Sequence, residues 1–209
     1  MASDQPAKTR STTSASSAPS SAGVILDDLA IQRALMRIAH EIVERNEELD
    51  RLYLVGIPNG GVPLARQIAQ NLREIAGVDV TVGVLDTTLY RDDRLTSGIR
   101  PKLRRTEMPS AVDDRLVILV DDVASTGRTI RAAMDALMDF GRPRAVQVVA
   151  LVDRGHRELP IKIDYVGKNI PTQRTDHVEL RERPGGEGME VVLMQGRGAP
   201  SLQAKGAPS

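Results

Sequence analysis

Short apolar runs along the chain alternate with longer segments in which apolar residues recur every three or four positions. The runs are typical of buried parallel strands, and the periodic segments are typical of amphipathic helices. The expected strands cover residues 52–57, 80–85, 117–120 and 145–152, with shorter candidates at 161–166, 178–180 and 191–194. The expected helices run from Asp27 or Asp28 to about Leu49, from Val62 to Ala76 and from Gly127 to Phe140. This alternation predicts an α/β protein with right-handed crossovers and a mostly parallel sheet.

Both ends of the chain lack these patterns. Residues 1–23 are rich in Ser, Thr, Ala and Pro, and residues 195–209 are rich in Gly, Ala, Pro and Ser. Such compositions are typical of disordered segments. We therefore expect one domain over residues 24–194 between two disordered tails. No apolar run approaches the roughly 20 residues that a membrane-spanning helix needs, so no membrane partner is expected.

The overall composition narrows the classes of chemistry. The 209 residues carry a formal net charge of zero, so any RNA site must be a local patch, and DNA is not an expected partner. The chain has no cysteine and three histidines, which excludes disulfides and disfavours a structural zinc site. One Phe, three Tyr and no Trp are too few for a base-stacking platform.

The segment 117–130 reads VILVDDVASTGRTI and joins an expected strand to a helix start. Asp121 and Asp122 follow the apolar run, where carboxylates can accept hydrogen bonds from sugar hydroxyls. Thr126 and Gly127 suit an anion, because glycine lets the backbone approach closely and a helix N-terminus favours negative charge. The segment predicts a ribose site beside a phosphate site. Two alternatives stay open: an aspartate that only caps the helix, and a metal-dependent phosphotransfer site.

Three other segments have two interpretations each. The turn at 58–61, Pro-Asn-Gly-Gly, could cradle a second phosphate or simply connect a strand to a helix. The charged stretch 91–105 could be a lid over the site, which we favour because of the strand that precedes it, or a solvated loop. On the first helix, a polar stripe opposite the apolar face is either solvated or an electropositive surface for a phosphate backbone. This stripe consists of Arg33, Arg37, His40 and Glu44.

Ligands of parallel α/β sheets bind at the carboxyl ends of the strands. The turns that follow Ile57, Leu85, Val120 and Val152 are therefore expected to converge on one cleft.

The order of apolar run, Asp-Asp and Thr-Gly-x-Thr resembles the phosphoribosyl pyrophosphate (PRPP) motif of type I phosphoribosyltransferases. Further strings resemble the PyrR family, over about residues 24–194. These strings are RALMRIAHE (33–41), TLYRDD (88–93), MDAL (134–137), GRP (141–143), LVDRGHRELP (151–160) and DYVGKNIPT (164–172).

The resemblance implies a type I phosphoribosyltransferase fold, with a mostly parallel central sheet, flanking helices and a small hood. It implies transfer of uracil onto PRPP to give UMP and pyrophosphate, with Mg²⁺ bound mainly through the pyrophosphate and by no protein site of its own. The implied catalytic residues are Asp121 and Asp122 on the ribose hydroxyls, and Arg91. The implied substrate-binding residues are Asn59, Gly60, Gly61, Val123, Ala124, Ser125, Thr126, Gly127, Arg128, Thr129, Val152, Asp153 and Arg154.

The same resemblance implies a second role, binding of pyr leader mRNA in response to UMP or UTP. The implied RNA-facing residues are Arg33, Arg37, His40, His156 and Lys168. We also expect a homodimer or a higher homo-oligomer, located in the cytoplasm.

The chain departs from the family pattern in two places. Where the family commonly has Thr-Arg-Gly, this chain has Asn59-Gly60-Gly61, and Ala124 and Ser125 are smaller than usual. The missing basic residue predicts weak transfer that an arginine at position 60 would strengthen. Two alternative functions follow: an RNA-binding, nucleotide-sensing regulator with weak or lost transferase activity, and a phosphoribosyltransferase for another base.

Overall fold

The computed structural model of this chain describes residues 22–58, 60–92 and 105–196. Asn59, the tails at 1–21 and 197–209, and most of the expected lid lie outside the described residues. Among the described residues, no helix is long and apolar enough to cross a membrane.

Two groups of strands and three longer helices make up the described fold. The helices are α1 (Asp28–Arg45), α2 (Gly61–Ala76) and α3 (Arg128–Leu137), with short 3-10 helices η1 (Leu49–Arg51), η2 (Thr88–Tyr90) and η3 (Met138–Phe140). The strands are β1 (Ala22–Leu26), β2 (Leu52–Gly56), β3 (Thr81–Val84), β4 (Leu116–Ala124), β5 (Ala145–Asp153), β6 (Tyr165–Asn169), β7 (His177–Glu182) and β8 (Met189–Met194).

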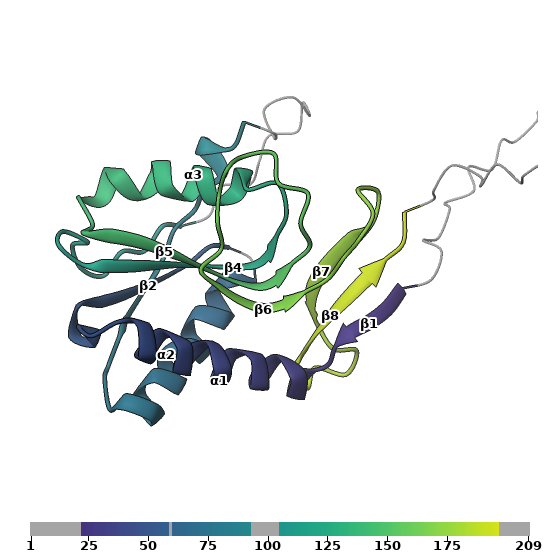
Figure 1. Cartoon of the computed structure of the whole chain (residues 1–209), viewed down its shortest axis with the longest axis horizontal. Coiled ribbons are helices and arrows are strands. Elements are labelled where there is room, and N and C mark those ends of the chain that lie inside the picture. Colours follow the sequence, from purple (N-terminus) through teal and green to yellow (C-terminus); the bar gives the residue numbers. More distant parts are fainter. Residues whose placement is uncertain (1–21, 59, 93–104, 197–209) are drawn as a thin grey trace, which may run out of the picture.

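The central sheet has five strands in the order β3-β2-β4-β5-β6, and every neighbouring pair is parallel. Helices α1 and α2 cover one face and α3 covers the other, so the fold has three layers (Figure 1). The predicted parallel α/β architecture is confirmed. This order places β4 at the centre, between β2 and β5.

Alternate residues of the central strands fill two separate cores. Leu54 and Ile118 pack toward α1 and α2, while Val55 and Leu119 pack toward α3. All four are fully buried, as the unbroken apolar runs predict for strands covered on both faces. The buried strands hold the carboxyl end of β4 in place, and the site lies at that end.

A second, antiparallel sheet, which we call the hood, has the strand order β1-β8-β7. It lies at one end of the molecule, where the colours of the first and last described segments meet (Figure 1). Strand β1 was not predicted, and it begins at Ala22, inside the expected tail. Strand β1 has the sequence AGVIL, and its strand partner is β8, which lies far along the sequence.

Several predicted boundaries were wrong for local reasons. Helix α1 ends at Arg45 rather than Leu49, because the side chain of Asn46 donates to the Ile42 carbonyl at 2.8 Å and closes the last turn. Strand β6 begins at Tyr165 rather than residue 161. Asp164 caps that entry, since its carboxylate accepts the Val148 N–H at 2.9 Å.

Candidate functional site

Strand β4 extends beyond the end of its neighbour β2, and the site lies along this extension. Strand β2 pairs with β4 only as far as Gly56 opposite Val120. Strand β5 continues beside β4 to Asp153 opposite Ala124. Strand β4 therefore runs through both acids instead of ending before them, as the sequence suggested. From Asp121 onward one edge of β4 has no β2 partner, and that edge becomes the wall of a cleft.

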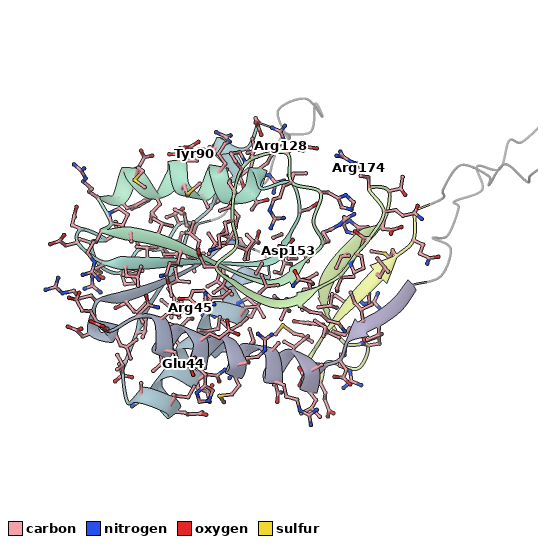
Figure 2. The ribbon with its side chains drawn as sticks, viewed as in Figure 1. Glu44, Arg45, Tyr90, Arg128, Asp153 and Arg174 are labelled. Atoms are coloured by element: carbon pink, nitrogen blue, oxygen red, sulfur yellow. The ribbon has the colours of Figure 1, made fainter. Side chains whose placement is uncertain are left out.

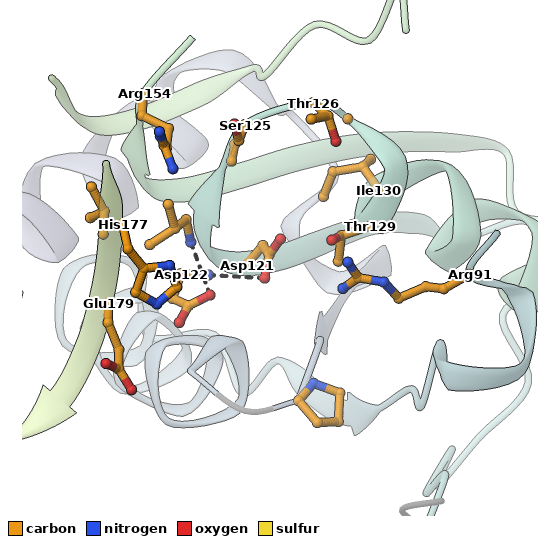
Figure 3. Close-up of a pocket in the computed structure, with 15 residues that line it drawn as sticks. Arg91, Asp121, Asp122, Ser125, Thr126, Thr129, Ile130, Arg154, His177 and Glu179 are labelled. Atoms are coloured by element: carbon orange, nitrogen blue, oxygen red, sulfur yellow. Dashed lines mark hydrogen bonds between the residues drawn. The ribbon is translucent and has the colours of Figure 1, made fainter. Parts of the chain in front are cut away.

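The cleft has a volume of about 420 Å³. Four turns that follow β2, β3, β4 and β5 contribute to it, so the predicted convergence at the carboxyl ends is confirmed. The hood strand β7 forms the wall on the opposite side (Figure 3). The lining residues are Pro58, Arg91, Asp121, Asp122, Val123, Ala124, Ser125, Thr126, Gly127, Thr129, Ile130, Arg154, His177, Val178 and Glu179.

The two acids lie on the cleft floor and differ in environment. Asp121 is 5% exposed, whereas Asp122 is partly exposed. Burial raises the pKa of Asp121 well above its usual range, and the neighbouring Asp122 raises it further, while Arg91 opposes both effects. The Asp121 carboxylate also accepts the Asp122 N–H at 3.1 Å, which fixes its orientation. The floor thus holds two carboxylates side by side at the centre of the cleft.

The loop that follows β4 is held from behind by the segment after β5. The carbonyls of Ala124 and Thr126 accept N–H groups of Arg154 and Glu158 at 3.1 and 3.0 Å. Arg157 donates to the Ser125 carbonyl at 2.5 Å. With these carbonyls engaged, the hydroxyls of the loop line the cleft (Figure 3).

The glycine at the start of α3 gives this loop its shape. Gly127 has a φ of 91°, a conformation that other residues rarely adopt. It is followed directly by the first turn of α3, whose N–H groups have no partners within the helix. The loop therefore combines hydroxyls with a helix N-terminus, an arrangement that binds phosphate groups.

Residues 21–183 match the phosphoribosyl transferase domain family. The chain is also 54% identical over 170 residues to the "Bifunctional protein PyrR" of Pelotomaculum thermopropionicum, covering 81% of this chain and 94% of that protein. The protein of the same name in Bacillus subtilis is 54% identical over 160 residues, covering 76% of this chain and 88% of that protein. The chain belongs to the PyrR family of phosphoribosyltransferases. The resemblance drawn from the sequence strings is confirmed.

Solved structures share the fold of this PyrR-family chain. A structure of Trypanosoma cruzi hypoxanthine phosphoribosyl transferase aligns with a TM-score of 0.64 at 20% identity, covering 83% of this chain and 91% of that one. A Staphylococcus aureus hypoxanthine phosphoribosyltransferase aligns with a TM-score of 0.56 at 20% identity, covering 72% and 79%. At this identity the likeness shows the type I phosphoribosyltransferase fold alone.

Most of the residues expected from the PyrR resemblance reach the cleft. Both acids, Arg91, Arg154 and the loop residues from Val123 to Gly127 line it, as does Thr129. Five of the other described residues do not line it, and two of these are Gly60 and Gly61 of the turn after β2. Val152 is fully buried in β5, and Asp153 forms an ion pair with Arg157 at 2.7 Å. The guanidinium of Arg128 contacts Asp92 and Glu158 at 2.7 and 2.9 Å.

The turn after β2 is packed too closely to offer side chains to a phosphate. A Cβ added at Gly60 would lie 2.6 Å from the Cγ of Asp122, and one at Gly61 would lie 3.0 Å from the Val120 carbonyl carbon. Gly60 has an ordinary φ of −79°. A side chain at position 60 would therefore press on Asp122, and this steric cost opposes the gain expected from an arginine there. Whether an arginine at position 60 strengthens the site stays a prediction for kinetics.

The expected RNA-facing residues are distributed over several elements. Arg33, Arg37 and His40 are exposed on α1. Arg37 donates to the Gly167 carbonyl of β6 at 2.6 Å, and Lys168 of β6 donates to the carbonyl of Ile25 at 3.2 Å. The α1 and β6 residues thus share one edge of the molecule.

His156, the fifth expected RNA-facing residue, lies in the loop after β5. There its ring nitrogen is 2.9 Å from the Thr172 carbonyl. It adopts a φ of 63°, which is unusual for a residue other than glycine. This placement puts His156 near Arg154, whose guanidinium contacts the Thr172 hydroxyl at 3.1 Å.

Sequence reasoning missed the hood side of the cleft. His177 and Glu179 are alternate residues of β7, so both side chains face the same way, and both line the cleft. The apolar signal of β7 is only Val178 and Leu180, which gave a doubtful strand and no site. The available signal was the alternation of polar His177 and Glu179 with apolar Val178, which is typical of a strand with one polar face.

The donors on the cleft floor fit a magnesium ion that arrives with substrate. Asp121 and Asp122 offer hard oxygen atoms, which Mg²⁺ prefers together with phosphates and water. Within the described ranges, no group of three or more His, Cys, Asp or Glu residues could hold a metal. The floor of the cleft thus offers carboxylates of the kind that bind Mg²⁺.

Proposed function

We propose that this protein transfers uracil onto PRPP, giving UMP and pyrophosphate, and also binds a pyrimidine-operon leader RNA in response to UMP or UTP. The observation that carries the transferase proposal is the end of β4. There, two carboxylates and a helix N-terminus with three hydroxyl-bearing residues line one cleft. Membership of a family whose curated relatives are named bifunctional supports two roles in one chain.

In this proposal, each part of PRPP binds a different part of the cleft. The hydroxyls of Ser125, Thr126 and Thr129, with the first turn of α3, hold the 5′-phosphate. Asp121 and Asp122 accept hydrogen bonds from the ribose hydroxyls. The distance between these two anchors fixes the sugar, so that its C1′ faces the open side of the cleft.

In the reaction, the bond from C1′ to the pyrophosphate oxygen breaks, a bond from C1′ to N1 of uracil forms, and the N1 proton leaves to the pyrophosphate or to water. Positive charge builds on the sugar and negative charge on the leaving pyrophosphate. The carboxylate of Asp122, and that of Asp121 when it is ionised, stabilise the first, and Arg91 on the cleft wall offers a positive charge for the second. Asp121 and Asp122 could help to hold Mg²⁺, which when bound would supply charge neutralisation for the leaving group.

The hood supplies the wall on the side of the base. His177 and Glu179 face the cleft across from the phosphate loop (Figure 3). A base attached at C1′ would extend away from the 5′-phosphate, toward this wall. Polar side chains there can read its N–H and C=O groups, and Glu179 can accept from an N–H.

The RNA proposal places a phosphate backbone along α1. Arg33 and Arg37 are exposed, and Lys168 extends the same edge from β6.

Replacing Arg33 and Arg37 with Ala should weaken leader-RNA binding, since two phosphate contacts are lost. The slope of log K against log salt concentration should become less steep by up to about two. Filter binding at several salt concentrations measures this. Unchanged RNA affinity with reduced transfer would assign the stripe to the enzyme.

Three further parts of the proposal need solution measurements. We propose a cytoplasmic location, and cell fractionation tests it. A homodimer or higher homo-oligomer is tested by analytical ultracentrifugation. The domain limits at 24–194 are tested by truncation.

One assay separates the transferase from its alternatives. The protein is incubated with PRPP, Mg²⁺ and each nucleobase in turn, and released pyrophosphate is measured. Release of pyrophosphate with uracil and with no other base supports the proposal. Release with a different base indicates a phosphoribosyltransferase for that base. No release from a protein that still binds UMP indicates a nucleotide-sensing regulator.

A further inference from the structure

Arg91 reaches the cleft from a segment with little regular structure. It follows η2, a helix of three residues, and lines the cleft opposite the hood. An arginine side chain loses considerable rotamer freedom when it is held in place. A fixed positive charge at this position therefore depends on contacts that hold the backbone on both sides of Arg91.

Tyr90, the residue before Arg91, contacts both α3 and the short helix η3 that follows it. Arg131 of α3 donates to the Tyr90 carbonyl at 2.9 Å. The Tyr90 hydroxyl donates to the carboxylate of Asp139 in η3. Tyr90 is thus held at both its main chain and its side chain.

Asp92, the residue after Arg91, contacts the start of α3. Asp92 accepts from Arg128 at 2.7 Å, and its carboxylate lies 3.8 Å from Arg131. Arg128 also donates to Glu158 at 2.9 Å, which ties it to the segment that supports the phosphate loop. Figure 2 shows Arg128 and Tyr90 over the outer side of α3.

We propose that Arg128 and Asp92 form a positioning pair that holds Arg91 at the cleft, so that Arg128 promotes the reaction through Arg91 and without touching substrate. The inference rests on the proposed phosphoribosyl transfer. Arg128 is the first residue of α3 and directly follows Gly127, so the pair links the phosphate loop to the backbone that carries Arg91. The side chains are 32% and 47% exposed, and ion pairs of that exposure add little to stability.

The kinetic test uses Arg128→Met, which keeps most of the side chain's apolar stem and removes its charge. We expect kcat/KM for PRPP to fall about tenfold, the effect of misplacing one charge-assisted contact. The matched control is Arg144→Met, which removes an ion pair with Glu48 of similar exposure, at the opposite ends of the strands. That control should keep the wild-type kcat/KM, and Arg128→Lys should recover part of the loss.

A double-mutant cycle shows whether Arg128 acts through Arg91. In an Arg91→Met background, adding Arg128→Met should change kcat/KM by less than about twofold, because the group being positioned is already absent. Equal tenfold losses with and without Arg91 would overturn the inference. So would wild-type kcat/KM in the folded Arg128→Met protein.

Hydrogen exchange tests the positioning without relying on activity. In Arg128→Met, the backbone amides of residues 84–92 should exchange faster than in wild type, while Arg144→Met leaves them unchanged. Unchanged exchange in Arg128→Met would overturn the inference even if transfer is confirmed. An absence of pyrophosphate release by the wild type would instead contradict the proposed function, and faster exchange would still show that Arg128 holds this segment.

Discussion

The turns that follow β2 and β4 are both rich in glycine, but the glycines serve different physical needs. In the β4 turn, Gly127 has a φ of 91°, and the nearest atom to an added Cβ would be 3.4 Å away. In the β2 turn, Gly60 has an ordinary φ, and an added Cβ would collide with Asp122. The first glycine shapes the loop that we propose binds phosphate, and the second leaves room for the acid beside it. Two turns of similar composition therefore have different structural roles.

The largest expected effect comes from removing the acids that lie between the two turns. Asp121→Asn with Asp122→Asn should weaken UMP binding by about 10² to 10⁴-fold, since each charge-assisted hydrogen bond contributes about 1.5–3 kcal/mol. Calorimetry with UMP measures this, and circular dichroism checks folding. Unchanged affinity in a folded double mutant would mean that the ribose lies elsewhere.

Filling the β2 turn should cost stability. In Gly61→Ala the new Cβ would lie 3.0 Å from the Val120 carbonyl carbon and closer still to its oxygen. Overpacking of this kind costs about 1–3 kcal/mol, and each kcal/mol lowers the Tm by roughly 2–4 °C in a chain of this size. Gly23→Ala is the control, because nothing lies within 4 Å of its added Cβ. Equal Tm values for the two variants would show that the turn has spare room.

Filling the same turn next to the acid should affect binding. Gly60→Ala should weaken UMP binding about tenfold, because the methyl group displaces Asp122 by pressing on its carboxylate. Gly60→Arg should likewise lower kcat/KM for PRPP. Steady-state kinetics and calorimetry measure both variants. A faster Gly60→Arg enzyme would restore the view that the missing arginine is the weak point.

The smallest expected effect is on stability and depends on pH. Burial and Asp122 raise the pKa of Asp121 above its ordinary value of 3.8. Between 3.8 and the raised pKa of the folded state, the folded protein holds a proton that the unfolded chain has released, so the folded state loses stability as pH rises through this window. Asp121→Asn should therefore have a Tm a few degrees above wild type at neutral pH.

The same linkage sets how that difference changes with pH. The advantage of Asp121→Asn should shrink toward pH 4, where the unfolded carboxyl also becomes protonated. Differential scanning calorimetry at several pH values measures it. An equal Tm difference at all pH values would show that the ionisation of Asp121 is not the cause.

Local patterns predicted the sheet, its helices and the β4 side of the cleft. Apolar runs marked β2, β4 and β5, and the two acids with Gly127 marked the loop, because all these signals lie within a few residues of one another. Two hood strands, β7 and β8, were expected as short candidates, but the third, β1, was not predicted. Strand β1 exists through pairing with β8, about 170 residues later, and no local pattern carries that contact.

Side-chain partners were also beyond the sequence. The motif includes Arg128, but only the fold shows that Asp92 and Glu158 engage its guanidinium. Gly60 was interpreted as a missing arginine, and the sequence did not show that it packs against Asp122. In both cases the deciding contact joins residues distant in sequence, and the residue type alone fits either interpretation.

The most direct test of the central claim is a crystal structure of the protein with UMP. The account predicts the 5′-phosphate in the loop from Ser125 to Thr129, the ribose hydroxyls on Asp121 and Asp122, and the base toward His177 and Glu179. A 5′-phosphate in the β2 turn, or a ribose that contacts neither acid, would contradict it.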